Sequence, residues 1–145
     1  MVANARDIGI HHAQHPPYHF LQQSAFSWHA FVAREQLTRV LTWIFLLDTA
    51  FVIFNNVPPR MSIKEMRTDL ATSEACFQAP TSELCYENLQ GDPITSRYML
   101  SSLTAAMCKQ RLDSQRRLAL ADIGSLNLFA LVSGKSHQQK WSLNY

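Results

Sequence analysis

The chain has 145 residues, of which 47% are hydrophobic and 17% are charged, and its formal net charge is +2. This composition is apolar enough to build a core, which excludes a disordered tail, and the length suits one domain rather than two. A nearly neutral chain also lacks the dense positive field of a protein that grips nucleic acid along its whole length.

Cysteine and glycine usage narrows the class further. The cysteines, Cys76, Cys85 and Cys108, are odd in number and form no CxxC pair, so we expect neither a disulfide framework nor a zinc finger. This pattern fits a reducing compartment, either the cytosol or the nucleus. Only four glycines are present, which argues against an all-β fold with many tight turns.

The first segment, residues 1–17, is expected to be a flexible leader that ends at Pro16–Pro17, and residues 18–145 are expected to form the folded part. Two histidines of the leader, His11 and His15, would share a helical face, and such a pair can bind a metal ion. His12 and His19 lie near them, but a matching pair of further ligands is missing. We therefore favour a solvated stretch over a metal site.

Residues 18–55 predict one or two helices, because apolar side chains recur at steps of three and four residues. Beyond Thr42 nearly all faces of this helix are apolar. A helix that is apolar all round is typical of a central position, covered by its neighbours. Such a helix cannot fold alone, so the chain must supply the cover or borrow it from a missing part.

The run 40–54 within this helix also needs to be considered as a membrane span. It is shorter than the roughly 18–20 residues that a span requires. Arg39 bounds it, and Asp48 lies in its middle, where a carboxylate in a bilayer would cost several kcal/mol. We therefore favour a helix buried in protein.

Start and stop signals divide the remaining chain. Asn55–Asn56 and Pro58–Pro59 end the long helix, and Ser62 with Glu65 fits a capping box that begins a short one. The later expected elements are a helix start at 73–74, a helix over 82–89, a turn at 90–93, and helices over 94–112 and 118–132. The whole predicts an all-α, irregular multi-helix bundle around a central apolar helix at about 28–55.

Catalytic signatures are absent from the sequence, which contains no GxGxxG, GxxxxGK, GxSxG or HExxH motif. Cys76 or Cys85 with a distant histidine could form a nucleophile and base. Neither cysteine lies in a local context that marks a reactive thiol, so packing is the favoured role. We expect no enzyme.

Asp48 is the most informative single polar residue, because it lies within an apolar run. A buried carboxylate must be paired or hydrogen-bonded, so its partner is expected to be a cation or a set of backbone donors. Arg60, just past the proline pair, is one candidate and Arg39 is another. We favour a structural ion pair over a ligand-contacting acid.

The basic cluster comprises Lys109, Arg111, Arg116 and Arg117, and Asp113 interrupts it. Its functional interpretations are contact with nucleic acid and a weak nuclear-import patch. The solvated face of a helix and its following turn is favoured instead. Aromatic residues do not interleave with these charges, which argues against a stacking platform for single strands.

Between Trp28 and Ala79 a set of residues occurs in a specific order that includes the motif Phe45-Leu46-Leu47-Asp48. Its members are Arg34, Glu35, Arg39, Asp48, Pro58, Pro59, Arg60, Glu65, Leu70 and Phe77. In this order the stretch resembles the fungus-specific transcription factor domain, the regulatory region of many fungal zinc-cluster and zinc-finger regulators. Ala71 stands where that family usually has proline, and Phe77 where it has tryptophan.

The resemblance implies an all-helical fold and a nuclear regulator of transcription. Such a region modulates activity through effector sensing, intramolecular inhibition or contacts with other protein domains, with self-association as a further option. It does not contact bases or a membrane. The family's zinc ligands have no matching positions here, so no cofactor is expected in this chain, and zinc and DNA binding would belong to a longer parent protein. The family domain is much longer, so the chain is expected to be a fragment.

Three hypotheses therefore differ in what they predict for the long helix. A regulatory and interaction domain predicts an ion-paired Asp48 and exposed apolar surface where a missing part would pack. An enzyme predicts a concave site with convergent polar groups around Asp48 or Cys76. A membrane-associated helical protein predicts that the 40–54 helix lies unshielded on the outside.

Overall fold

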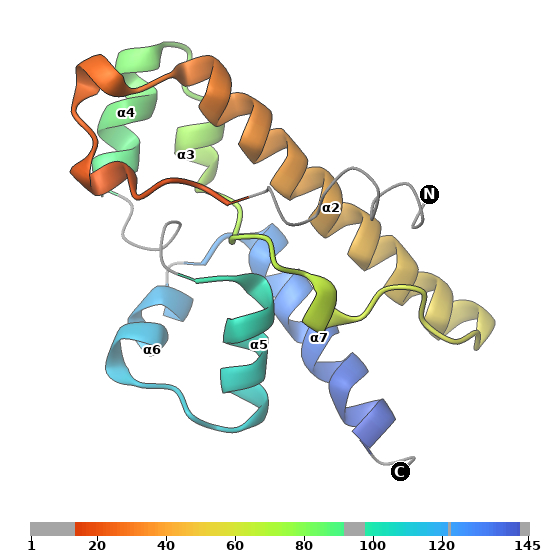
Figure 1. Ribbon diagram of the computed structural model, residues 1–145. Coiled ribbons are helices and arrows are strands. Elements are labelled where there is room, and N and C mark those ends of the chain that lie inside the picture. Colours follow the sequence, from red (N-terminus) through yellow and green to blue (C-terminus); the bar gives the residue numbers. More distant parts are fainter. Residues whose placement is uncertain (1–13, 92–97, 122, 143–145) are drawn as a thin grey trace.

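The computed structural model describes residues 14–91, 98–121 and 123–142. This part of the chain holds six α-helices joined by loops and single 3-10 turns, and it contains no β-strand (Figure 1). The predicted all-α class is confirmed.

The longest helix, α2, spans Trp28–Asn55, which confirms the predicted central helix. The Ser27 hydroxyl caps its start by accepting a hydrogen bond from the Ala30 amide at 3.4 Å. It ends where Asn56 adopts the left-handed conformation with φ 49°, a conformation that asparagine tolerates better than most residues. The prolines at 58 and 59 then prevent the helix from continuing.

A smaller core packs against the N-terminal half of α2. It is built by the 3-10 turn Tyr18–Phe20 and by two helices, α3 at Glu74–Phe77 and α4 at Ser82–Gly91, which lie together at one end of α2 in Figure 1. Its buried residues are Tyr18, Phe31, Cys76, Ala79, Cys85 and Leu89. Aromatic rings of three segments meet here, with Tyr18 edge-on to Phe31 at 5.8 Å.

A larger core lies beside the C-terminal half of α2. Here α5 at Leu100–Cys108 packs along α7 at Ser125–Ser142, and both contact the 3-10 turn Ile63–Glu65. Gly134 permits this approach, because a Cβ atom there would lie 3.0 Å from the Ile63 side chain. The buried residues are Leu41, Phe45, Leu46, Met61, Ile63, Met66, Leu70, Leu100, Leu103, Ala119, Ala130 and Leu131.

The extended segment 68–72 joins the two cores. It pairs with the chain entering α5, where the Leu70 amide donates to the Tyr98 carbonyl and the Leu100 amide to the Thr68 carbonyl. The Asn127 side chain of α7 then makes two hydrogen bonds to the main chain of Ala71, at 2.9 and 2.8 Å. A single amide side chain thus satisfies both main-chain polar groups of the buried residue Ala71.

Several predicted boundaries are wrong. The helix expected over 118–132 is two helices, α6 at Ser114–Ala121 and α7, separated at Gly124, because glycine favours a break over a helix interior. The helix expected over 94–112 is α5, which ends at Cys108, close to Gln110 with a φ of 53°. Residues 94–97 lie outside the described residues. The capping box is also incomplete, because the Ser62 hydroxyl accepts from the Lys64 amide and a single 3-10 turn follows.

The two long faces of α2 have an unusual polarity. The buried face carries five polar residues among its ten buried ones, namely Glu35, Thr38, Thr42, Asp48 and Thr49. The opposite face is apolar from residue 40 onward, and its side chains are 49–85% exposed at Val40, Trp43, Leu47, Phe51 and Phe54. We call this set the outer face. The described helices shield only one side of α2 (Figure 1). The other side carries the exposed apolar surface that the regulatory-domain hypothesis predicts, and the described part of the chain does not supply its cover.

Two phenylalanines on α2 test this polarity directly. Phe45 is fully buried, whereas Phe54 is 85% exposed on the same helix. We expect Phe45→Ala to lower the free energy of unfolding by about 3–5 kcal/mol, because it leaves a cavity in the larger core. Phe54→Ala should change it by less than about 0.5 kcal/mol. Urea unfolding followed by circular dichroism measures both, and equal losses would contradict the assigned faces.

Candidate functional site

The polar centre of the smaller core is the carboxylate of Glu35, which is fully buried on α2. Its Oε1 atom accepts hydrogen bonds from the Arg39 guanidinium at 2.7 Å and from the Thr72 amide at 3.0 Å. Its Oε2 atom lies 3.1 Å from Nε2 of His15. A buried charge is tolerated only when it is paired and hydrogen-bonded, and Glu35 has partners from three segments.

Arg39 extends this network to the surface. Its guanidinium also donates to a Glu74 carboxylate oxygen at 2.7 Å and to the Thr72 carbonyl at 2.9 Å. The same group lies 4.0 Å above the centre of the Phe77 ring, at cation–π distance. Glu35, Arg39 and Phe77, which the sequence motif groups together, therefore meet in space.

His15 completes the network from the N-terminal side. Its amide donates to the Asp69 carboxylate at 2.6 Å, and its Nδ1 atom lies 3.1 Å from the Tyr18 hydroxyl. His15 is only 8% exposed, so the expectation of a solvated histidine in the leader is wrong at this position. The carboxylates of Glu35 and Asp69, which come from distant parts of the sequence, bind His15 and offset the free-energy cost of burying its polar groups. His11, His12 and most of the predicted leader lie outside the described residues.

Burial and hydrogen bonding oppose each other at the two carboxylates of this network. Burial raises the pKa of Glu35, but hydrogen bonds from His15 and Arg39 outweigh it, so the net pKa is lowered and the charged form is held. Burial raises the pKa of Asp69, and the His15 amide only partly offsets the rise. Glu35 is fully covered and bonds to His15, Arg39 and Thr72, so it holds three segments together and offers no surface to a substrate.

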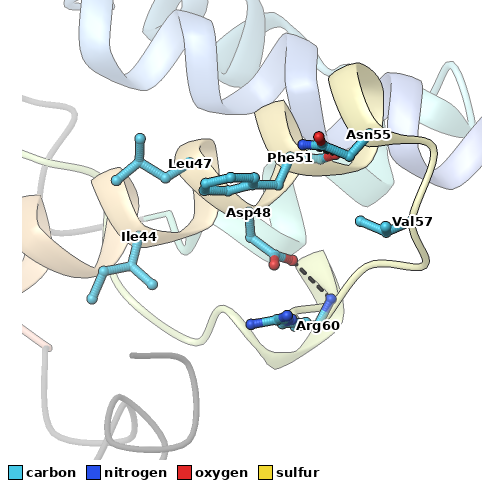
Figure 2. Close-up of a pocket in the computed structure, with 7 residues that line it drawn as sticks. All are labelled: Ile44, Leu47, Asp48, Phe51, Asn55, Val57 and Arg60. Atoms are coloured by element: carbon cyan, nitrogen blue, oxygen red, sulfur yellow. Dashed lines mark hydrogen bonds between the residues drawn. The ribbon is translucent and has the colours of Figure 1, made fainter.

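Asp48 lies closer to the C-terminal end of α2 than Glu35 does. Its Oδ2 atom accepts two hydrogen bonds. The donors are the main-chain amides of Arg60 and Met61, both at 2.9 Å, and the first of these bonds is drawn in Figure 2. Backbone donors, one of the two predicted partner types, are therefore present. Arg39 is not a partner, because it lies nine residues away, roughly 13 Å along the helix, and pairs with Glu35 and Glu74.

Asp48 lies beside an open cleft of about 590 Å³ between α2 and the turn that follows it. The lining is formed by Ile44, Leu47, Asp48, Phe51, Asn55, Val57 and Arg60 (Figure 2). The walls are mainly apolar, and two of them, Leu47 and Phe51, belong to the outer face. Because one oxygen of Asp48 already caps two amides, the cleft suits an apolar side chain better than a reaction centre.

Two of the three thiols, those of Cys76 and Cys85, are packed in the smaller core. Cys76 is buried and accepts from the Ser73 hydroxyl at 3.2 Å. Burial raises the pKa of Cys85 to about 11, with further contributions from Cys76 and Glu35, so its thiolate is strongly disfavoured at neutral pH. Among the described residues, no three His, Cys, Asp or Glu side chains are grouped so that they could hold a metal ion.

The remaining motif residues do not share one site, although Arg34 donates a hydrogen bond to Tyr18 beside the Glu35 network and Arg60 borders the cleft at Asp48. Leu70 is fully buried in the larger core, Pro59 is half-buried, and Arg34, Pro58, Arg60 and Glu65 are exposed. The basic cluster follows α5 and enters α6. Within it Arg116 pairs with Asp113 at 3.3 Å, and the Arg117 guanidinium donates to the Leu112 carbonyl. These contacts are local, as the solvated-face interpretation expects.

Three residues that hold the buried segment 68–72 escaped the sequence analysis. Asn127 lies in a periodic apolar stretch, and nothing in the neighbouring sequence indicates its two hydrogen bonds to Ala71. Asp69 and Thr72 flank the motif residues Leu70 and Ala71, and a polar residue on either side of a buried segment is the signal that could have marked them.

The helix α2 is the one described helix long and apolar enough to cross a membrane, and 44% of its most apolar stretch is buried within the protein. Core helices of soluble proteins satisfy the same criteria. The protein contacts of Asp48 and Glu35 satisfy its polar side, whereas the outer face remains exposed.

Known proteins provide one informative similarity. The chain is 50% identical over 137 residues to "Transcription factor verF" of Penicillium polonicum. The match covers 92% of this chain and 19% of that relative, so the chain spans about a fifth of the relative's length. No family model matches the chain, and no solved structure matches it. The chain is thus similar to a region of a fungal transcription factor, while its assignment to the fungus-specific regulatory domain stays a prediction.

Removing the Asp48 carboxylate should destabilise the protein. In Asp48→Ala the amides of Arg60 and Met61 lose their acceptor, and we expect a loss of about 2–4 kcal/mol in the free energy of unfolding. Asp48→Asn keeps one side-chain oxygen and should lose about half as much. Leu47→Ala, on the exposed side of the cleft, is the matched control in urea unfolding. A fully stable Asp48→Ala protein would show that the carboxylate is not structural.

The lowered pKa of Glu35 gives a pH dependence with a defined sign. Its contribution to stability is present above the ordinary value of 4.5 and is lost as the pH falls through the lower folded-state pKa. We expect Glu35→Gln to be about 3 kcal/mol less stable at pH 7, with the gap to the wild type closing in acid. The raised pKa of Asp69 acts in the opposite direction but is present in both proteins. Thermal unfolding between pH 7 and pH 3 measures the gap, and a constant gap would contradict the assignment.

Proposed function

We propose that this chain is a regulatory and interaction region of a fungal transcription factor, which acts in the nucleus through protein contacts. The observation that carries the proposal is the 50% identity to verF over 92% of the chain. The fold is compatible with this role, because the resemblance to the regulatory domain implies an all-helical fold and the described part of the chain is helical.

The outer face of α2 supports the choice of protein contacts. Large exposed apolar patches on a folded domain mark interaction surfaces, and tryptophan and phenylalanine are enriched in the centres of such interfaces. Trp43, Phe51 and Phe54 supply these side chains, and the cleft beside Phe51 offers a recess for a partner's side chain.

Base recognition is assigned to another part of the regulator. The formal charge of +2 provides little attraction for phosphates, and the basic cluster is engaged in local contacts. We therefore infer that zinc and DNA binding belong to a separate module of a longer protein and that this chain needs no cofactor. The partners are other domains of the regulator, with self-association as the alternative.

Catalysis is disfavoured by the state of the groups that could perform it. Glu35 is covered by Arg39, His15 and Thr72, Asp48 caps two amides, and the pKa of Cys85 is raised to about 11. Membrane association is the second candidate, because the outer face of α2 is apolar enough for a lipid surface. The experiment below separates regulation from both alternatives.

A chimera tests the regulatory role. Replacing the matched segment of verF by this chain should retain transcription of genes whose transcripts fall when verF is deleted, whereas deleting the segment should abolish it. The double variant Leu47→Glu/Phe51→Glu should lower those transcripts, and Gln36→Glu, on the exposed polar part of α2, should not. Transcript quantification provides the readout, with fluorescence microscopy for nuclear location. The proposal fails if the chimera with this chain behaves like the deletion.

The isolated chain supplies an independent check on base contact. We expect no electrophoretic mobility shift of promoter DNA at physiological salt. A shift that weakens steeply with added salt would instead assign phosphate contacts to this chain.

A further inference from the structure

The outer face of α2 has the pattern of a helix–helix contact on the side that the described part of the chain does not cover. Its residues follow steps of three, four, four and three from Val40 to Phe54, which keeps them on one stripe roughly 21 Å long. Between Val40 and Pro59 the only charged residue is Asp48, and it belongs to the opposite, buried face. A stripe of this spacing packs best against another helix.

The extent of the stripe distinguishes between possible occupants. Its three aromatic side chains account for roughly 300–500 Å² of exposed surface, because each can bury about 150–250 Å² and they are 55%, 62% and 85% exposed. Val40 and Leu47 add about half of two smaller side chains. A stable dimer buries about 800 Å² on each partner and must also offset the entropy of association. A helix tethered within the same polypeptide avoids most of that entropic cost. The area therefore favours an intramolecular occupant over a second copy.

The relative provides the chain from which such a helix can come. This sequence matches 19% of verF, so about four fifths of that protein lies outside the matched region. We propose that, in a protein of this kind, an apolar α-helix from the unmatched part packs along the outer face of α2 and inserts a side chain into the cleft formed by Leu47, Phe51 and Val57. This inference rests on the proposed function and names the partner of its interaction surface.

The polarity of α2 supports the same occupant. The inner face already satisfies its charged groups through Glu35–Arg39 and through the amides that bind Asp48. The outer face is formed by apolar side chains, which water solvates poorly and a second apolar helix solvates well. With such a helix in place, α2 would be covered on both sides, as its apolar composition predicts.

Hydroxyl-radical labelling read by mass spectrometry tests the proposal. Oxidation of Trp43, Phe51 and Phe54 should fall several-fold in the verF chimera relative to the isolated chain, whereas Phe20, an exposed aromatic outside the outer face, should keep its reactivity. In the chimera, Leu47→Glu/Phe51→Glu should restore oxidation of Trp43 and Phe54, and Gln36→Glu should not. Circular dichroism of the isolated double variant checks that α2 still folds.

The other occupants give different outcomes. Unchanged oxidation in the chimera overturns the proposal, and so does protection in the isolated monomer. Protection that rises with concentration of the isolated chain, with a dimer in sedimentation, would assign the face to a second copy. Protection by phosphatidylcholine vesicles alone would assign it to lipid. If the chimera is protected but transcription is not retained, the helix docking stands and the proposed function fails. If transcription is retained without protection, the proposed function stands and the helix docking is overturned.

Discussion

The buried carboxylate of Glu35 is the interaction on which the arrangement of the chain depends. It joins α2 to the N-terminal segment through His15, to the extended segment through Thr72, and through Arg39 to the start of α3. Each contact crosses a large distance in sequence, so the carboxylate fixes where three loops lie on the helix. Its lowered pKa has the same origin, because donors that position the loops also stabilise the negative charge.

The extended segment 68–72 connects the Glu35 network to the larger core. One end is held by Glu35 and Arg39 at Thr72, and the middle is held by Asn127 of α7 at Ala71. Main-chain bonds to residues 98–100 satisfy part of this segment, and side chains satisfy peptide groups at Ala71 and Thr72, which makes those side chains hard to replace. The two cores are thus linked by polar contacts on a buried segment, while apolar packing holds each core together.

The sequence predicted the parts of this architecture that depend on local pattern. The end of α2 followed from Asn55–Asn56 and the two prolines. Glu35, Arg39 and Phe77, which the resemblance to a known family placed in one motif, meet in space. The roles of His15 and Asn127 could not be predicted, because each depends on a partner more than 50 residues away. The split between α6 and α7 was missed because the helical spacing of apolar residues continues across Gly124, although the helix itself is interrupted there.

The polarity of α2 was also beyond the sequence, and it explains why the helix looked apolar on every side. The periodicity of a helix shows where its apolar residues lie, but not which of its sides the rest of the chain covers. In α2 the covered side carries Glu35 and Asp48. The two charges hold the fold at the inner side, so exposed carbon on the outer side contributes little to it. Stability, and the docking that we propose, therefore involve opposite faces of one helix. Phe51 lies sixteen residues from Glu35, roughly 24 Å along the helix, so substitutions at Phe51 can alter an interaction without weakening the network around Glu35.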